Sequence, residues 1–221
     1  LNKSANGLQV AQERLSSGLR INSAKDDATG LGIATNYDKQ IRGTNVAIRN
    51  ASDAISKAQT NDGYAAQIHE NLKRLYEIAV QLGGTASGAE TTALVAENAR
   101  IAGLTTAATA TTVDGNGTQV TGVSAVIAAP TGLTAAAITT DIGTVTTARA
   151  NYGADMVRFA SAVATMQTES VNLSASFSRI MDTDYAAETA SQARNNILQQ
   201  AGTAVLAQAN QTPQSVLTLL R

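Results

Sequence analysis

The sequence has no cysteine and no tryptophan among its 221 residues, and only 3% of the residues are aromatic. The absence of cysteine excludes disulfides, thiolate metal sites and thiol nucleophiles, and is compatible with either an exported or a cytosolic protein. Because large aromatic side chains are scarce, the core has to be built from Ala, Leu, Ile and Val. Small residues of this kind favour close contact between helices. Self-association would supply burial that such a core lacks.

Strong charge of either sign is also missing. The chain carries 16 basic and 17 acidic residues, for a net charge of −1, so it has no basic field that would attract nucleic acid. No run of about 18 apolar residues occurs, which predicts no membrane insertion. No cleavable signal peptide is visible at Leu1. The sequence opens in what reads as the middle of a helix, so we expect the natural N-terminus to lie upstream.

Proline is nearly absent from the two ends of the chain, where apolar residues recur at helical spacing. Only Pro130 and Pro213 occur. Gly83-Gly84 is typical of a helix end, and Thr212-Pro213 predicts the end of the last helix. The predicted helices cover residues 1–17, from between 27 and 33 to about 82, 90–104, 156–180 and 185–211.

The middle of the chain is chemically sparse. Residues 105–145 contain only two charged side chains, Asp114 and Asp141, in a run dominated by Thr, Ala, Gly and Val. Asp-Gly-Asn-Gly at 114–117 stands between β-prone segments and predicts a hairpin turn. We therefore expect short strands or loops in this segment.

Two stripes of apolar residues alternate steps of three and four along the predicted helices, which is the spacing of a coiled-coil seam. We expect the stripe at 68–82 to pack antiparallel against the stripe at 156–180, because the intervening chain must fold back. The predicted fold is mainly α: a long antiparallel helical hairpin or coiled-coil bundle of the two ends, with a small irregular or β central region. The seam residues are Ile68, Leu72, Leu75, Leu82, Phe159, Val163, Met166, Leu173, Phe177 and Ile180.

The last helix has a small apolar face, and a lone helix of this composition is marginal in water. It should order against other copies of itself or against the N-terminal helix. The residues expected to make these contacts between subunits are Leu8, Leu15, Ile197, Ala201, Val205, Leu217 and Leu220.

Candidate metal sites are incomplete. His69-Glu70 begins a His-Glu-x-x-His pattern, but Lys73 stands at the fifth position and the chain has no second histidine. Asp114 and Asn116 resemble the start of a calcium loop, but Ala125 stands where the bidentate carboxylate belongs. We expect a helical surface histidine and a hairpin turn, and no metal or cofactor.

Paired carboxylates are the other candidate for catalysis. Asp26-Asp27 and Asp182 with Asp184 stand at predicted helix starts, where carboxylates favour the helix dipole. No further polar cluster accompanies them, so capping is preferred over acid–base catalysis. We name no catalytic residue.

Longer runs of sequence carry more information. Residues 14–28, Arg-Leu-Ser-Ser-Gly-Leu-Arg-Ile-Asn-Ser-Ala-Lys-Asp-Asp-Ala, strongly resemble the N-terminal signature of bacterial flagellin. The likeness covers about 1–82 and 172–221 and includes the segments 40–43, 50–56, 58–60, 72–81, 178–180, 184–186, 197–203 and 206–220.

The resemblance implies an extracellular subunit of the flagellar filament, exported by the flagellar type III apparatus for swimming motility. Its implied partners are copies of itself, an export chaperone, and the cap and hook-associated proteins. It also implies three regions: inner filament-core helices at 1–33 with 183–221, an outer helical bundle at 34–104 with 146–182, and a surface-exposed variable region at 105–145. The family's Phe-Asn-Gly hairpin sequence is missing from 85–145, which implies a small or absent outer domain.

Flagellins of many bacteria are recognised by a Toll-like innate immune receptor. The positions that match the family's contacts are Arg74, Ile78 and Glu97, and Tyr76 stands where the family often has Arg. Arg74 and Ile78 could equally serve subunit packing.

Three other functions compete with that of a filament subunit. A hook–filament junction protein shares its terminal helices with flagellin, but the match running to Leu220 favours flagellin. A surface carbohydrate-binding protein needs an aromatic groove, and only Tyr152 and Phe159 lie near the sparse segment. An enzyme would need a catalytic insertion, for which residues 105–145 are too short.

Overall fold

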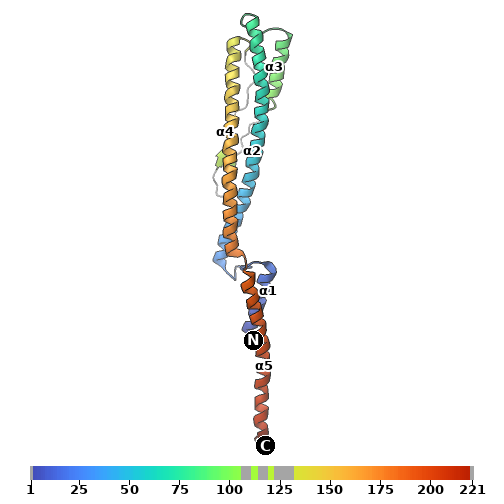
Figure 1. The fold of residues 1–221 in the computed structure, drawn as a ribbon, viewed down its shortest axis with the longest axis vertical. Helices are drawn as coiled ribbons and strands as arrows, with labels where there is room; N and C mark the ends of the chain where they lie inside the picture. The colour runs from blue at the N-terminus through green and yellow to red at the C-terminus, as the bar shows by residue number, and fades with distance from the viewer. Residues whose placement is uncertain (1, 106–110, 114–118, 122–131, 220–221) are drawn as a thin grey trace. The chain divides into compact units, whose positions relative to one another are not determined.

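The computed structural model describes the backbone of residues 2–105, 111–113, 119–121 and 132–219, with side chains described at 2–105 and 132–209. Within these residues the fold is mainly α, as the sequence predicts (Figure 1). The elements are α1 (Asn2–Ser17), α2 (Ala28–Gln81), α3 (Ala89–Ala102), β1 (Thr111–Val113), β2 (Gln119–Thr121), α4 (Ala135–Met181) and α5 (Tyr185–Leu219).

The chain divides into two compact units. The first contains residues 1–38 and 173–221, and the second contains residues 39–172. Because each unit has its own apolar clusters, we describe them separately.

The second unit is built on antiparallel packing of α2 and α4, with α3 beside them (Figure 1). One cluster joins Ile68, Leu72 and Leu75 of α2 to Ile138 and Tyr152 of α4. A second cluster brings the earlier part of α2 to the later part of α4, and it consists of Ala47, Ala51, Ala54, Phe159 and Met166 with Ile48, Ile55, Ala162 and Val163 around them. Later residues of one helix meet earlier residues of the other, so the antiparallel prediction is right.

The predicted register of this pairing is wrong. The stripe at 68–82 packs against residues 138–152 of α4, and not against 156–180. Helix α4 begins at Ala135, whose N–H donates to the carbonyl of Gly84 at 3.0 Å. The start of α4 is therefore held beside the end of α2, and the two helices run together from that point.

Leu82 does not belong to the seam. It follows the last residue of α2 and its side chain is 55% exposed. Gly83 and Gly84 take φ values of 78° and 117°, which are positions that favour glycine and end the helix. The chain turns away before Leu82 can face α4.

Residues 135–145 are helical, where the sequence predicts short strands or loops. The threonines here bond their own helix: the Oγ1 atoms of Thr139, Thr140 and Thr144 donate to the carbonyls four residues earlier, at 2.8 to 3.1 Å. These bonds pair the hydroxyls within their own helix, which is how threonine is accommodated in a helix interior at a small cost in stability. Ile138, Val145 and Tyr152 supply the buried stripe at steps of seven.

The two short strands pair antiparallel, with Thr111 opposite Thr121 and Val113 opposite Gln119. The predicted hairpin turn at 114–117 joins them in sequence but lies outside the described residues, as does the incomplete calcium pattern.

The predicted end of the last helix at Thr212-Pro213 is also wrong, because α5 continues to Leu219. Proline removes one backbone donor, but its fixed φ matches that of a helix. The other predicted helices begin and end within a few residues of α1, α2 and α3.

Candidate assembly surface on the terminal helices

In the first unit, α1 packs antiparallel along the beginning of α5. Near the end of α1, Arg14 Nη1 lies 3.5 Å from Glu188 Oε2. Near its start, Gly7 faces Asn195, and a Cβ at Gly7 would lie 2.9 Å from Asn195 Nδ2. Ala11, between these contacts, is fully buried. Small residues thus let the two helices approach closely.

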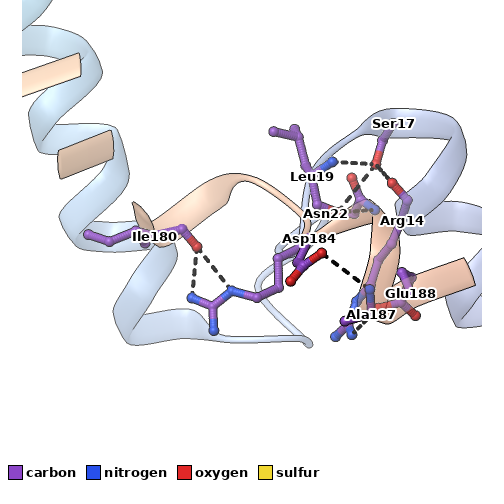
Figure 2. A network of polar contacts seen from close by, with 9 residues as sticks. Arg14, Ser17, Leu19, Asn22, Ile180, Asp184, Ala187 and Glu188 are labelled. Carbon is purple, nitrogen blue, oxygen red and sulfur yellow. Dashed lines mark hydrogen bonds and ion pairs between the residues drawn. The ribbon is translucent and has the colours of Figure 1, made fainter. Parts of the chain in front are cut away.

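The turn after α1 is tied to the connection between α4 and α5 (Figure 2). Gly18 takes a φ of 73°, which redirects the chain. The N–H of Arg20 then donates to the carbonyl of Met181 at 2.6 Å, and the N–H of Thr183 donates to the carbonyl of Gly18 at 3.0 Å. Leu19 and Asp182 pair as an isolated antiparallel bridge in the same connection.

Arg20 also closes the end of α4. Its Nη2 and Nε donate to the carbonyl of Ile180 at 2.7 and 3.2 Å (Figure 2). The last carbonyls of a helix have no partner within the helix, and a positive charge there is favourable. This contact supplies both a donor and a charge.

Two of the carboxylates singled out in the sequence, Asp27 and Asp184, serve as caps. Asp27 Oδ1 accepts from the N–H of Gly30 at 2.8 Å at the start of α2. Asp184 Oδ1 accepts from the N–H groups of Ala186 and Ala187 at 2.9 and 3.2 Å at the start of α5. These are the N-cap bonds expected for Asp, so the preference for capping over acid–base catalysis is confirmed for both residues.

Asp26 organises the preceding turn. Its Oδ2 accepts from the hydroxyl and the N–H of Ser23, both at 3.0 Å, and from the N–H of Asn22 at 3.2 Å. These bonds lower the pKa of the exposed Asp26 carboxyl, the Ser23 hydroxyl having the largest effect. Asp182 accepts from the hydroxyl of Ser178.

A small apolar cluster supports these turns. Ile21, Ala34 and Met181 are buried at its centre. Phe177 and Ile180, predicted to face the stripe at 68–82, pack instead around this cluster with Leu19 and Leu31. The end of α4 therefore packs on the turns that connect the terminal helices.

The later part of α5, from beside the start of α1 onward, carries an exposed apolar face. In Figure 1, α5 continues well beyond the N-terminal end of α1. Ile197 is 64% and Val205 is 67% exposed, and Leu198 and Leu206 are each half exposed. Leu198 and Val205 are seven residues apart and lie close together around the helix, between Ile197 and Leu206, so the four side chains cover about half of the helix circumference. We define these four residues as the α5 face.

The other residues predicted to join subunits lie in varied positions. Ala201 is exposed on α5, whereas Leu8 and Leu15 of α1 are half-buried. Leu217 and Leu220 lie outside the residues with described side chains. The sequence interpretation missed Leu198 and Leu206, although each directly follows a residue that it named.

The positions matched to receptor contacts do not share one exposed surface. Arg74 is exposed, and its Nε donates to Glu90 at 2.8 Å and its Nη1 to Glu77 at 3.1 Å. Glu97 is bonded to Arg100 at 2.7 Å. Ile78, however, is only 7% exposed and belongs to the core between α2 and α4. Its side chain faces the bundle, so the expectation of a surface contact there is wrong.

No centre for metal chemistry is assembled within the part of the chain that the structure describes, where no three His, Cys, Asp or Glu residues gather in ion-binding geometry. Within the same part, no helix has the length and apolar character needed to cross a membrane. His69 is half-buried on α2, and its Nδ1 has no hydrogen-bond partner.

Paired terminal helices, an extended helical hairpin and an uncovered apolar face together define a structural protein of the self-assembling helical class. Comparison with known proteins gives the family. Residues 1–121 match the bacterial flagellin N-terminal helical region, and residues 135–220 match the bacterial flagellin C-terminal helical region. The chain belongs to the bacterial flagellin family.

Individual relatives agree along nearly the whole chain. It is 38% identical to a flagellin of Halalkalibacterium halodurans and 31% identical to a flagellin of Bacillus subtilis, in each case over 96% of this chain and 92% of the relative. A flagellin of Salmonella muenchen is 52% identical over 98 residues, which are 44% of this chain and 19% of that protein. The chain is thus a structural subunit of the flagellar filament, and a role in motility follows from the family.

Proposed function

We propose that the α5 face, consisting of Ile197, Leu198, Val205 and Leu206, is a surface through which copies of this chain join in the filament. The observation that carries the proposal is the exposure of four large apolar side chains on one helix. Leaving such side chains in water is unfavourable, at about 25 cal/mol for each Å² of apolar surface. A contiguous exposed apolar surface is typical of an interaction site.

The charge pattern of the same helix supports a second copy as the partner. From Asn195 to Leu220 the sequence has no charged residue. Two copies therefore meet along this segment without repulsion between like charges and without burying an unpaired ion. The apolar spacing is that of helices that pack side by side, as Leu198 and Val205 repeat after one heptad.

The division of the chain within the filament is part of this proposal. Residues 1–33 with 183–221 form the inner core, residues 34–104 with 146–182 form the outer bundle, and residues 105–145 face the outside except at Ile138 and Val145, which are buried against α2. The pairing of α1 with α5 in one compact unit supports the first assignment. The contacts between subunits include Leu8, Leu15, Ala201, Leu217 and Leu220 besides residues of the α5 face.

Other partners are proposed from the family alone. They are the flagellar type III export apparatus with its chaperone, the filament cap and the hook-associated proteins. For a Toll-like receptor, Arg74 and Glu97 offer charged groups at the surface, and Ile78 would contribute only by holding α2 in place.

The α5 face is tested by replacing Ile197 and Val205 together with Gln, which keeps helix propensity and length but removes the apolar groups. The matched control is Ala207→Gln, since residue 207 is exposed and lies about 180–200° around the helix from Leu198 and Val205, on the side opposite the middle of the α5 face. Electron microscopy and sedimentation should show filaments for the wild type and the control and none for I197Q/V205Q, with equal helix content by circular dichroism. Normal filaments from I197Q/V205Q would overturn the proposal.

A further inference from the structure

Helix α3 packs on α2 through a face that mixes apolar and buried polar residues. Its apolar members, Leu94, Ile101 and Ala102, belong to the same cluster as Leu72 and Leu75 of α2. Two polar residues, Thr91 and Asn98, are buried on the same face, separated by seven positions. The inner face of α3 thus has heptad spacing with polar residues at equivalent positions.

The buried polar residues include one pair that joins the two helices. Asn71 Nδ2 donates to Asn98 Oδ1 at 2.7 Å, and Gln67 Nε2 donates to Asn71 Oδ1 at 3.1 Å. Asn98 is fully buried and Asn71 nearly so. The Nδ2 of Asn98 has no partner, so its amide depends on Asn71 for the bond that it makes.

The apolar contacts alone do not select one alignment of α3 along α2. A shift of α3 by one turn would bring Leu94 or Ile101 to the present level of Asn98, and an aliphatic side chain would still be buried against α2 there. The same shift would separate Asn71 from Asn98, so the Asn98 amide would be buried without a partner and the Asn71 amide would keep only its bond from Gln67. Burying an amide without a hydrogen-bond partner costs free energy. The polar pair therefore favours one alignment of α3 along α2, which the apolar residues alone do not.

The connection before α3 does little to favour one alignment of α3 over another. Ala86 is held by its N–H bond to the carbonyl of Leu133 at 2.8 Å, and only Ser87 and Gly88 separate it from Ala89. Gly88 has a φ of 113°, and glycine takes positive and negative φ values about equally readily, so the link does not impose one conformation. The ion pair of Arg74 with Glu90 is exposed, and such pairs contribute little.

We propose that the hydrogen bond between Asn71 and Asn98 is a register lock that sets which turn of α3 packs on which turn of α2. A single buried asparagine is known to fix register between helices at a cost in stability. The proposal makes two predictions. Apolar replacement of both amides should allow more than one alignment of α3 without unfolding the chain. Moving one amide by a turn should move α3 along α2 by a turn.

The test measures the distance between spin labels on α2 and α3 in the full chain. Because the sequence has no cysteine, Arg49→Cys and Ala96→Cys, both at exposed positions, give one labelled pair. Labelled chain is diluted into an excess of unlabelled chain, so that only distances within one molecule are read. Double electron–electron resonance should give one narrow distribution for the otherwise unchanged protein.

In this background N71L/N98L should add a second population displaced by about 5 Å, the rise of one helical turn. Thr91→Val is the matched control, because it removes a buried polar group of the same face whose Oγ1 has no partner. It should keep the single distance. An unchanged single distance in N71L/N98L would overturn the proposal and assign the register to the link or the ion pair.

A second variant keeps the test decisive if N71L/N98L folds poorly. Leu94→Asn with Asn98→Leu retains the composition of α3 but moves its amide by one turn. The lock predicts that the whole distribution shifts by about 5 Å as Asn71 bonds the relocated amide. A distribution identical to that of the unchanged protein would contradict the lock.

Discussion

Arg20 donates two hydrogen bonds to the carbonyl oxygen of Ile180, a residue 160 positions further along the chain. The contact joins the turn after α1 to the end of α4. Together with the bonds from Arg20 N to Met181 and from Thr183 N to Gly18, it closes the first unit around the start of α5. The terminal helices are therefore positioned by a compact polar turn as well as by their own packing.

Replacing Arg20 with Met should destabilise this turn. The variant keeps an extended apolar stem but loses both donors to Ile180 and the charge at the end of α4. We expect a loss of about 1 kcal/mol in the free energy of unfolding, since hydrogen bonds of this kind contribute modestly at an exposed site. Urea denaturation followed by circular dichroism measures it. Arg20→Lys, which retains the charge, should lose less, and equal stability of R20M and the wild type would refute the assignment.

The close approach of α1 and α5 depends on Gly7. A Cβ there meets only the end of the flexible Asn195 side chain, which can move aside. Gly7→Ala should therefore be neutral or stabilising, because alanine favours the helix by up to about 1 kcal/mol. Gly7→Leu should separate the helices and lower the melting temperature of the full chain. If the leucine variant melts at the same temperature as the alanine variant, the helices do not pack closely at this point.

The turn at 22–26 should lose stability in acid. The pKa of Asp26 is lowered in the folded protein by its bonds from Ser23 and Asn22. A group with a lowered folded pKa stabilises the fold above its unfolded pKa, near 3.8, and this contribution is lost as the pH falls through the folded pKa. An NMR titration of the Asp26 carboxyl should show a lowered pKa in the wild type and a higher one in Ser23→Ala. An identical midpoint in both proteins would show that Ser23 is not the cause.

The core between α2 and α4 should be sensitive at Phe159. Its ring is fully buried among Ala47, Ala51 and Ala54, so truncation leaves a cavity that the small neighbours cannot fill. Phe159→Ala should cost about 3–5 kcal/mol. Val157→Ala, at a side chain 71% exposed on the same helix, should change stability by less than about 0.5 kcal/mol. Equal effects in chemical denaturation would place Phe159 outside a packed core.

The helices at the two ends could be predicted because their apolar residues recur at helical spacing, as at Ile68, Leu72 and Leu75. The start of α4 could not, because threonine and alanine carry no strong periodic signal. Its helix is stabilised by the burial of Ile138 in the cluster with α2, while Thr139 and Thr140 bond their own backbone. Without this early start, the predicted register of α4 against α2 was necessarily wrong.

The candidate surface was foreseeable in part. Ile197 and Val205 stand out as large apolar residues in an uncharged segment, and the structure leaves both exposed. The buried pair of Asn71 and Asn98 was not foreseeable, since each residue alone reads as an ordinary surface position. The prediction that Leu82 belongs to the seam was wrong for a local reason, because α2 ends one residue before it.

The central claim is that the α5 face is covered by another copy of the chain. The most direct measurement is the reaction rate of a thiol at Val205→Cys with a hydrophilic reagent, since this would be the only cysteine in the protein. In the monomer the side chain is exposed, so the thiol should react freely. In assembled filaments of the same variant the rate should fall sharply. Filaments in which this thiol reacts as fast as in the monomer would contradict the account.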